Sequence, residues 1–181
     1  NFTSYHIMCI RHVVRYLKAT HNCGIKFNKN PDFDRKNLTF KVYSGDCAKE
    51  SNTRFGFVGL LLDTPITYQT FSTQALSHTT IENRIKAMYY ASKEILCLQE
   101  LIQELGKVKL ELPTSIYVEN LKELELSGSV KILNIYDFYL RQLHAEGKFK
   151  FQQVDSCNNL ASLLTQPLSR TKFLRLRDQL M

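Results

Sequence analysis

The chain has no tryptophan, and only seven glycines and four prolines occur among its 181 residues. So few chain-breaking residues argue against long disordered or low-complexity linkers. No apolar run is long enough to cross a bilayer, no charged-then-apolar leader opens the chain, and no repeat period is visible. The hydrophobic fraction of 44% and the charged fraction of 23% are those of an ordinary globular protein. The length therefore predicts one domain, with room for a short appendage.

The sequence also lacks the patterns of a zinc site. Its cysteines are odd in number and widely spaced, without a Cys-x-x-Cys pair: Cys9, Cys23, Cys47, Cys97 and Cys157. The five histidines are scattered, and none stands at ligand spacing with an acid. Reduced thiols in an intracellular compartment, either cytoplasmic or nuclear, are the simpler interpretation.

Positive charge is in excess, with a formal net charge of +7. This excess favours contact with a polyanion such as nucleic acid, and a basic but inert surface is the alternative. The candidate phosphate contacts are Lys86, Lys93, Arg175 and Arg177. The alternative is that these four are ordinary solvated residues. Because no base-reading motif is present, such binding is expected to be electrostatic and indifferent to sequence.

Hydrophobic periodicity predicts the order of helices and strands. Helical spacing is found over 6–19, 79–105, 120–126, 131–145, 159–164 and 169–180. Strand patterns are found over 25–27, 38–43, 55–62, 66–70, 115–118 and 149–154, with a turn at 63–65. From residue 38 onward the order is β-β-β-α-β-α-β-α, followed by a last helix. It predicts an α/β fold with a five-stranded mixed sheet, three antiparallel strands and then parallel ones, flanked by helices.

Five segments in this order resemble one known family. They are RHVVRYLKAT at 11–20, TPITY at 64–68, KEILCL at 93–98, IYVEN at 116–120 and LASLLTQPL at 160–168. Together they resemble the RNase H domain at the C-terminal end of a Ty1/copia-type retrotransposon polyprotein. The resemblance implies an RNase H-like fold and three parts: a lead-in from the reverse transcriptase region over 1–30, the RNase H-like domain over 38–168, and a basic C-terminal helix over 169–181.

The departures from the family concern its four metal-binding carboxylates. The resemblance places these at Ser44, Arg84, Glu119 and Ser162, of which only Glu119 is acidic. Asp46 lies two residues after Ser44, on the same face of a continuing strand, and is a possible fifth site residue. Two-metal hydrolysis needs several carboxylates around two Mg²⁺ ions, whereas serine brings no charge and arginine repels the metals. The arginine is expected to pair with Glu119 or Asp46 instead.

The resemblance and its departures together suggest a degenerate, domesticated copy that has become a pseudoenzyme. We expect a catalytically inactive RNase H-like domain without a cofactor, serving as a scaffold for protein contacts or for weak nucleic-acid binding. One alternative is an active ribonuclease H that cuts the RNA strand of RNA–DNA hybrids with two Mg²⁺ ions. Another is a decayed fragment without selected function. Neither a membrane nor a small molecule is expected as a partner.

Overall fold

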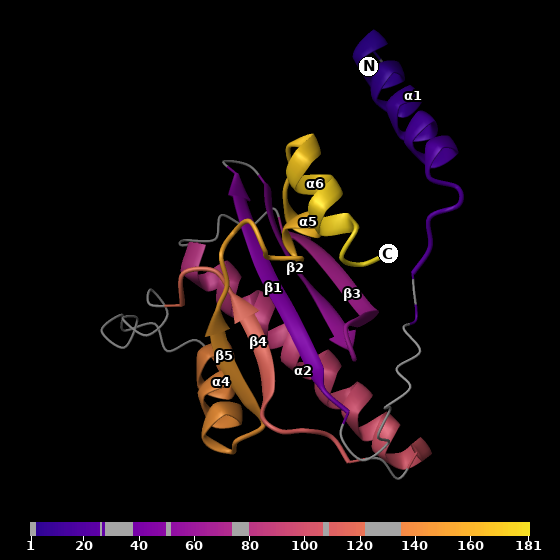
Figure 1. The fold of residues 1–181 in the computed structure, drawn as a ribbon. Helices are drawn as coiled ribbons and strands as arrows, with labels where there is room; N and C mark the ends of the chain where they lie inside the picture. The colour runs from indigo at the N-terminus through magenta and orange to yellow at the C-terminus, as the bar shows by residue number, and fades with distance from the viewer. Residues whose placement is uncertain are drawn as a thin grey trace.

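The computed structural model describes residues 3–25, 27, 38–49, 52–73, 80–106, 109–121 and 135–181. The strands are β1 (Phe40–Lys49), β2 (Asn52–Leu61), β3 (Thr64–Thr73), β4 (Thr114–Val118) and β5 (Phe149–Gln153). The helices are α1 (Ser4–Ala19), α2 (Thr80–Gly106), α4 (Ile135–Ala145), α5 (Ser162–Thr165) and α6 (Arg170–Arg177). Figure 1 shows these elements along the chain. The order of the five strands and of the helices between and after them, as predicted from residue 38 onward, is confirmed.

The five strands form one mixed sheet in the order β3-β2-β1-β4-β5. The first three strands pair antiparallel, and β4 and β5 join parallel to β1 and to each other. This is the predicted five-stranded arrangement. β1 is longer than its alternating pattern indicated, because β2 pairs with it as far as Lys49, opposite Asn52. The extension carries Ser44 and Asp46 within the strand.

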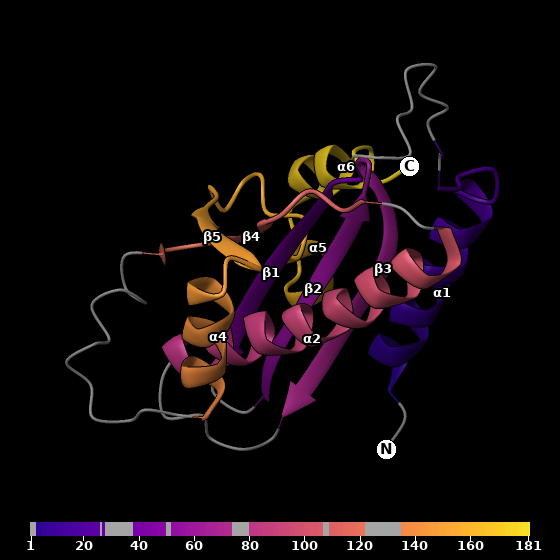
Figure 2. The same ribbon diagram turned by 90° about the horizontal axis from the view of Figure 1, so that it is seen from below.

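Helices cover the two faces of the sheet unequally, as Figure 2 shows. α2 and α4 lie on one face over the larger core, which includes the buried Phe57, Ile95 and Ile116. α5 and α6 lie on the other face over a smaller core that includes Val58 and Leu176. Neighbouring residues of β2 thus serve opposite cores, because successive side chains of a strand point to opposite faces.

The turn predicted at 63–65 was wrong by one position. The two-residue turn consists of Leu62 and Asp63, whose φ angles are 51° and 62°. Two residues with positive φ between paired strands give the turn whose twist suits a hairpin. Thr64 and Pro65 already belong to β3, and a proline is tolerated there because β3 is an edge strand.

Other predicted elements are wrong, shifted or partly outside the described residues. The strand expected over 25–27 is wrong at Ile25 and Phe27, which lie in no strand. Most of the helix expected over 120–126, and residues 131–134 of the next one, lie outside the described residues. The helix expected from residue 159 begins only at Ser162. Asn159 precedes it and takes a structural role instead.

Helix α1 has a position of its own. It contains no buried residue, and large apolar side chains such as Ile10, Val14 and Leu17 are exposed. It touches the rest of the domain at its C-terminal end, where the rings of Tyr16 and Phe173 meet edge-on at 5.7 Å. Figure 1 shows the helix standing beside the sheet rather than on it.

Candidate functional site

Four elements bring the predicted site positions together around the second half of β1. Ser44 lies within β1 and is fully buried. Arg84 lies near the start of α2, and Ser162 begins α5; both are almost completely buried. Glu119 directly follows β4. These positions come together because α2, β4 and α5 all pack against β1.

The arginine of this site is neutralised by a carboxylate. Arg84 Nε donates to Asp46 Oδ1 at 3.2 Å, and the two side chains are only 9% and 7% exposed. Asp46 is one of the two partners expected for Arg84. In such a buried position, each charge depends on the other, because removing either would leave an uncompensated charge inside the protein.

An asparagine that the sequence did not single out connects the other positions. The fully buried Asn159 donates through Nδ2 to the Ser44 carbonyl oxygen at 3.0 Å and to Glu119 Oε1 at 3.1 Å. Its Oδ1 accepts from the backbone N–H of Ala161 at 3.1 Å, just before α5 begins. One side chain therefore fixes β1, the end of β4 and the start of α5 relative to one another.

The hydroxyl of the buried Ser44 is poorly satisfied. Ser44 Oγ is buried and has no hydrogen-bond partner within the part of the chain that the structure describes. A buried hydroxyl without a partner costs about 1–3 kcal/mol. Ser44 therefore contributes neither a negative charge nor a satisfied side-chain hydrogen bond to the site.

The donors around β1 do not fit a pair of magnesium ions. Of the four side chains predicted at the family's carboxylate positions, two are serines, one is arginine and one is Glu119, which accepts a hydrogen bond from Asn159. Asp46 is engaged by Arg84. Across the described residues, no group of three His, Cys, Asp or Glu side chains is placed to hold a metal ion. Hard cations such as Mg²⁺ require oxygen ligands whose charge offsets their own, and this set does not supply it.

Comparison with known proteins relates the chain to retrotransposon polyproteins. No family model matches the chain. The Retrovirus-related Pol polyproteins from transposons RE1 and RE2 of Arabidopsis thaliana are 25% and 24% identical to it over 177 residues. The chain is homologous to Ty1/copia-type Pol polyproteins. The matches cover 94% of this chain but only 12% of each polyprotein, so the chain spans about an eighth of their length.

A solved structure supports the fold. The N-terminal RNase H domain of a Mycobacterium tuberculosis protein, studied as a fusion with maltose-binding protein, superposes with a TM-score of 0.51 at 11% identity. The superposition covers 78% of this chain and 97% of that domain. The chain therefore has an RNase H-like fold and is homologous to retrotransposon Pol polyproteins. Within its described residues, no helix is both long and apolar enough to traverse a bilayer.

The cations expected to contact phosphates are divided between two faces of this RNase H-like domain. Lys86 and Lys93 lie on α2, where Lys86 pairs with Glu82 at 2.7 Å and Lys93 lies 5.5 Å from the centre of the Tyr89 ring. Arg175 and Arg177 lie on α6, beyond the opposite face of the sheet. The hydrogen bond from Arg177 to Asp178 raises the arginine pKa. The structure therefore does not gather these four residues into one surface.

Proposed function

We propose that this RNase H-like domain no longer cleaves RNA–DNA hybrids, and that it binds nucleic acid weakly and without sequence preference. The buried ion pair between Arg84 and Asp46 carries the first part of the proposal. Its guanidinium lies among the positions that match the family's metal-binding carboxylates. The pair supports the view that the charges of this site neutralise each other and that no metal ions are needed to hold it together.

Electrostatics explains why this arrangement opposes catalysis. Two unit charges about 4 Å apart interact by ~4 kcal/mol at an effective dielectric constant of about 20. A divalent metal ion near Arg84 would meet a larger repulsion, while Ser44 and Ser162 would offer no compensating negative charge. Two-metal phosphodiester hydrolysis requires both ions to stabilise the attacking and leaving oxygens. The charge balance of this site therefore supports the loss of cleavage.

Nucleic-acid binding is supported by cations whose contacts are with neutral groups rather than with carboxylates. The net charge of the chain is +7. Arg175 and Lys172 donate to the neutral side chains of Asn158 and Ser156, and Lys93 lies against an aromatic ring. Contacts of this kind attract phosphates without reading bases, and the affinity falls with salt as counterions are released. A filter-binding series on hybrid, duplex and single strands at rising salt tests this part.

Cleavage of a labelled RNA–DNA hybrid in Mg²⁺ and in Mn²⁺ tests the loss of catalysis. The unaltered chain is expected to leave the hybrid intact with either ion. A variant with all four carboxylates restored, Ser44→Asp, Arg84→Glu, Glu119→Asp and Ser162→Asp, serves as the matched comparison. Metal-dependent cleavage by the unaltered chain that disappears in Glu119→Ala would overturn the proposal and favour an active ribonuclease H.

A scaffold for protein contacts is the second candidate, and helix α1 favours it. The apolar side of α1 is exposed at Ile10, Val14 and Leu17 and is not covered by the sheet or by α2. In the simplest case a second copy of the chain covers this side. Light scattering over a concentration series would then detect dimers, and the pair Ile10→Lys and Val14→Lys would abolish them. Monomers at every concentration would exclude this case.

We also infer that the domain works inside the cell, in the cytoplasm or the nucleus. All five cysteines lie in the described part of the chain, and all are free thiols. Four of them are exposed, where an oxidising compartment would modify or pair them. Localisation of a tagged chain by microscopy, combined with thiol labelling in lysates, tests this inference.

A further inference from the structure

The sheet face opposite α2 is covered over only part of its width. α5 packs against β1, β2 and β3, whereas β4 and β5 continue beyond it. In Figure 1 these two strands extend away from α5 and α6. The face therefore leaves partly or fully exposed side chains on β4 and β5 beyond α5, while Tyr43 of β1 packs at the edge of the smaller core.

The side chains on this open part follow from strand alternation. Val42 and Ile116 point into the larger core under α2, so their neighbours Tyr43 and Tyr117 point to the other face. On β5, Phe149 faces the larger core, and Lys150 faces away from it and is exposed. We call this surface the tyrosine face, defined by Lys41, Tyr43, Ser115, Tyr117, Lys150 and Gln152.

Two stacked aromatic rings form the centre of the tyrosine face. The rings of Tyr43 and Tyr117 lie 4.9 Å apart at an angle of 19°, and both side chains are partly exposed. Burial, followed by the neighbouring Tyr117, raises the pKa of Tyr43. The phenol therefore stays neutral at physiological pH and does not repel an anionic ligand.

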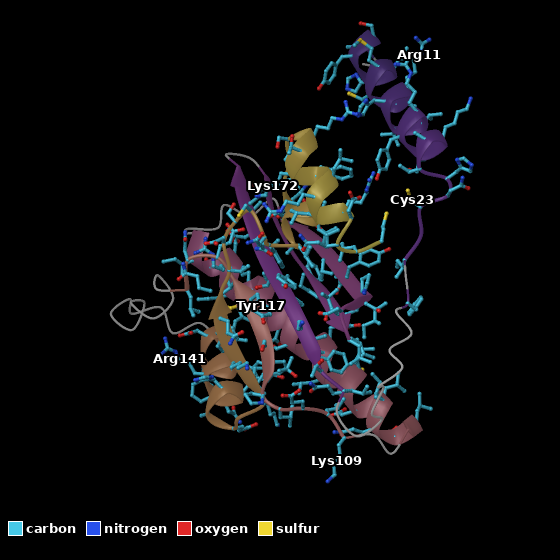
Figure 3. The ribbon with its side chains drawn as sticks, in the orientation of Figure 1. Arg11, Cys23, Lys109, Tyr117, Arg141 and Lys172 are labelled. Carbon is cyan, nitrogen blue, oxygen red and sulfur yellow. The ribbon has the colours of Figure 1, made fainter. Side chains whose placement is uncertain are left out.

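Cations border the two rings. Lys150 is exposed on β5, where it pairs in register with Ser115 of β4. On α6, Lys172 Nζ donates to Ser156 Oγ at 3.2 Å, and Arg175 Nη2 donates to Asn158 Oδ1 at 2.6 Å. Both contacts lie on the segment that leads from β5 to α5, and Figure 3 shows Tyr117 and Lys172 from the same side of the sheet.

The acids near this surface are partly engaged. Asp63 pairs with Lys41 at 2.6 Å, so these two charges offset each other. Glu119 accepts a hydrogen bond from Asn159, and Asp155 is exposed at the border. The remaining cations, Lys150, Lys172 and Arg175, outnumber these two acids and leave the surface positive.

We propose that the tyrosine face binds single-stranded nucleic acid, with an unpaired base stacking on Tyr117, which Tyr43 supports from the smaller core, and phosphates contacting Lys150, Lys172 and Arg175. Aromatic rings bordered by cations suit single strands, because unpaired bases offer their faces for stacking whereas bases within a duplex do not. This inference rests on the proposed nucleic-acid binding and gives it a ligand class and a location. It needs no metal ion and no residue of the catalytic positions.

Fluorescence anisotropy with a labelled oligothymidine and a duplex of equal length, at low salt, tests the inference. The unaltered chain should prefer the single strand. Tyr117→Ala should weaken single-strand binding about ten-fold, as expected for loss of one stacked base, while Tyr117→Phe should retain it. Tyr68→Ala is the control for removing an exposed tyrosine elsewhere, since Tyr68 lies on the edge strand β3 and is 70% exposed.

Two charge-reversal variants keep the test independent of any effect on folding. Lys150 and Arg141 are both exposed, but Arg141 lies on α4, which covers the opposite face of the sheet. Lys150→Glu should weaken single-strand binding, and Arg141→Glu should leave it nearly unchanged. Equal effects of the two charge changes, or no preference for the single strand, would overturn the assignment of the tyrosine face and leave diffuse electrostatic binding intact. Absence of binding to every nucleic acid at low salt would remove the proposed binding function itself.

Discussion

Arg84 of α2 and Asp46 of β1 are joined by an ion pair of 3.2 Å whose two side chains are more than nine-tenths buried. The pair connects the long helix to the central strand at positions that the resemblance predicted for the family's metal-binding site. A buried pair of this kind adds little net stability compared with apolar residues, but it is costly to break on one side only. The domain has thereby become dependent on an arginine that a metal-binding site could not accommodate.

Replacing one partner of this pair should reveal that dependence. Arg84→Ala is expected to lower the free energy of unfolding by about 3–5 kcal/mol, because it leaves the Asp46 carboxylate buried without its cation. The double change Arg84→Met with Asp46→Leu should cost clearly less, since neither charge remains. Urea denaturation followed by circular dichroism measures both values. Equal losses in the single and double variants would contradict this account.

Asn159 should be as important for stability as any core side chain. Asn159→Leu keeps a similar volume but removes the donor to Ser44 and Glu119 and the acceptor for Ala161. The buried backbone groups left without partners should lower the free energy of unfolding by about 2–4 kcal/mol. Asn158→Ala is the matched control, because the Asn158 side chain accepts an exposed hydrogen bond from Arg175; the change should cost less than about 1 kcal/mol.

Magnesium should not stabilise the domain. A ligand that binds only the folded state stabilises it by RT ln(1 + L/Kd), where L is the free ligand concentration, and raises the melting temperature as L exceeds Kd. Since Ser44, Arg84 and Ser162 offer no carboxylate, millimolar Mg²⁺ should leave the melting temperature unchanged, and EDTA should have no effect. Thermal melts of the unaltered chain and of the variant with four restored carboxylates provide the comparison. A saturable Mg²⁺-dependent rise in the unaltered chain that Glu119→Ala removes would exclude this expectation.

Alkaline pH should selectively weaken the contact between the two stacked tyrosines. Burial raises the pKa of Tyr43 in the folded state, so the folded chain retains a proton that the unfolded chain releases. The associated stability is complete below the ordinary tyrosine pKa of about 10 and is lost as the pH rises through the higher folded-state value. Tyr43→Phe should therefore lose less stability than the unaltered chain over this alkaline range. Parallel curves of unfolding free energy against pH for the two proteins would show that Tyr43 does not contribute.

The sequence predicted the sheet because its pattern is local. The alternation around Phe57 and Val58 and the helical spacing of Ile85, Met88 and Ile95 are visible within single segments, and the structure confirms the strand and the helix they predict. The turn at Leu62 and Asp63 was misplaced because neither glycine nor asparagine marks its two positive φ angles.

The site was harder to predict because its contacts are distant in sequence. Asn159 reaches partners 115 and 40 positions away, so no spacing rule could identify it. The sequence also could not predict on which face of the sheet each cation lies. Lys93 and Arg175 look alike in the sequence, but only the folding of the sheet decides that they face opposite sides.

Helix α1 has a consequence for how the chain opens. Because none of its residues is buried, unfolding α1 exposes little new apolar surface and costs little free energy. An isolated helix of 16 residues is only marginally stable in water. We therefore expect its amide protons to exchange with solvent long before those of β1 or α2, up to the Tyr16–Phe173 contact. In these terms the domain is one cooperative unit built on the sheet, joined to a short helix that is expected to open on its own timescale.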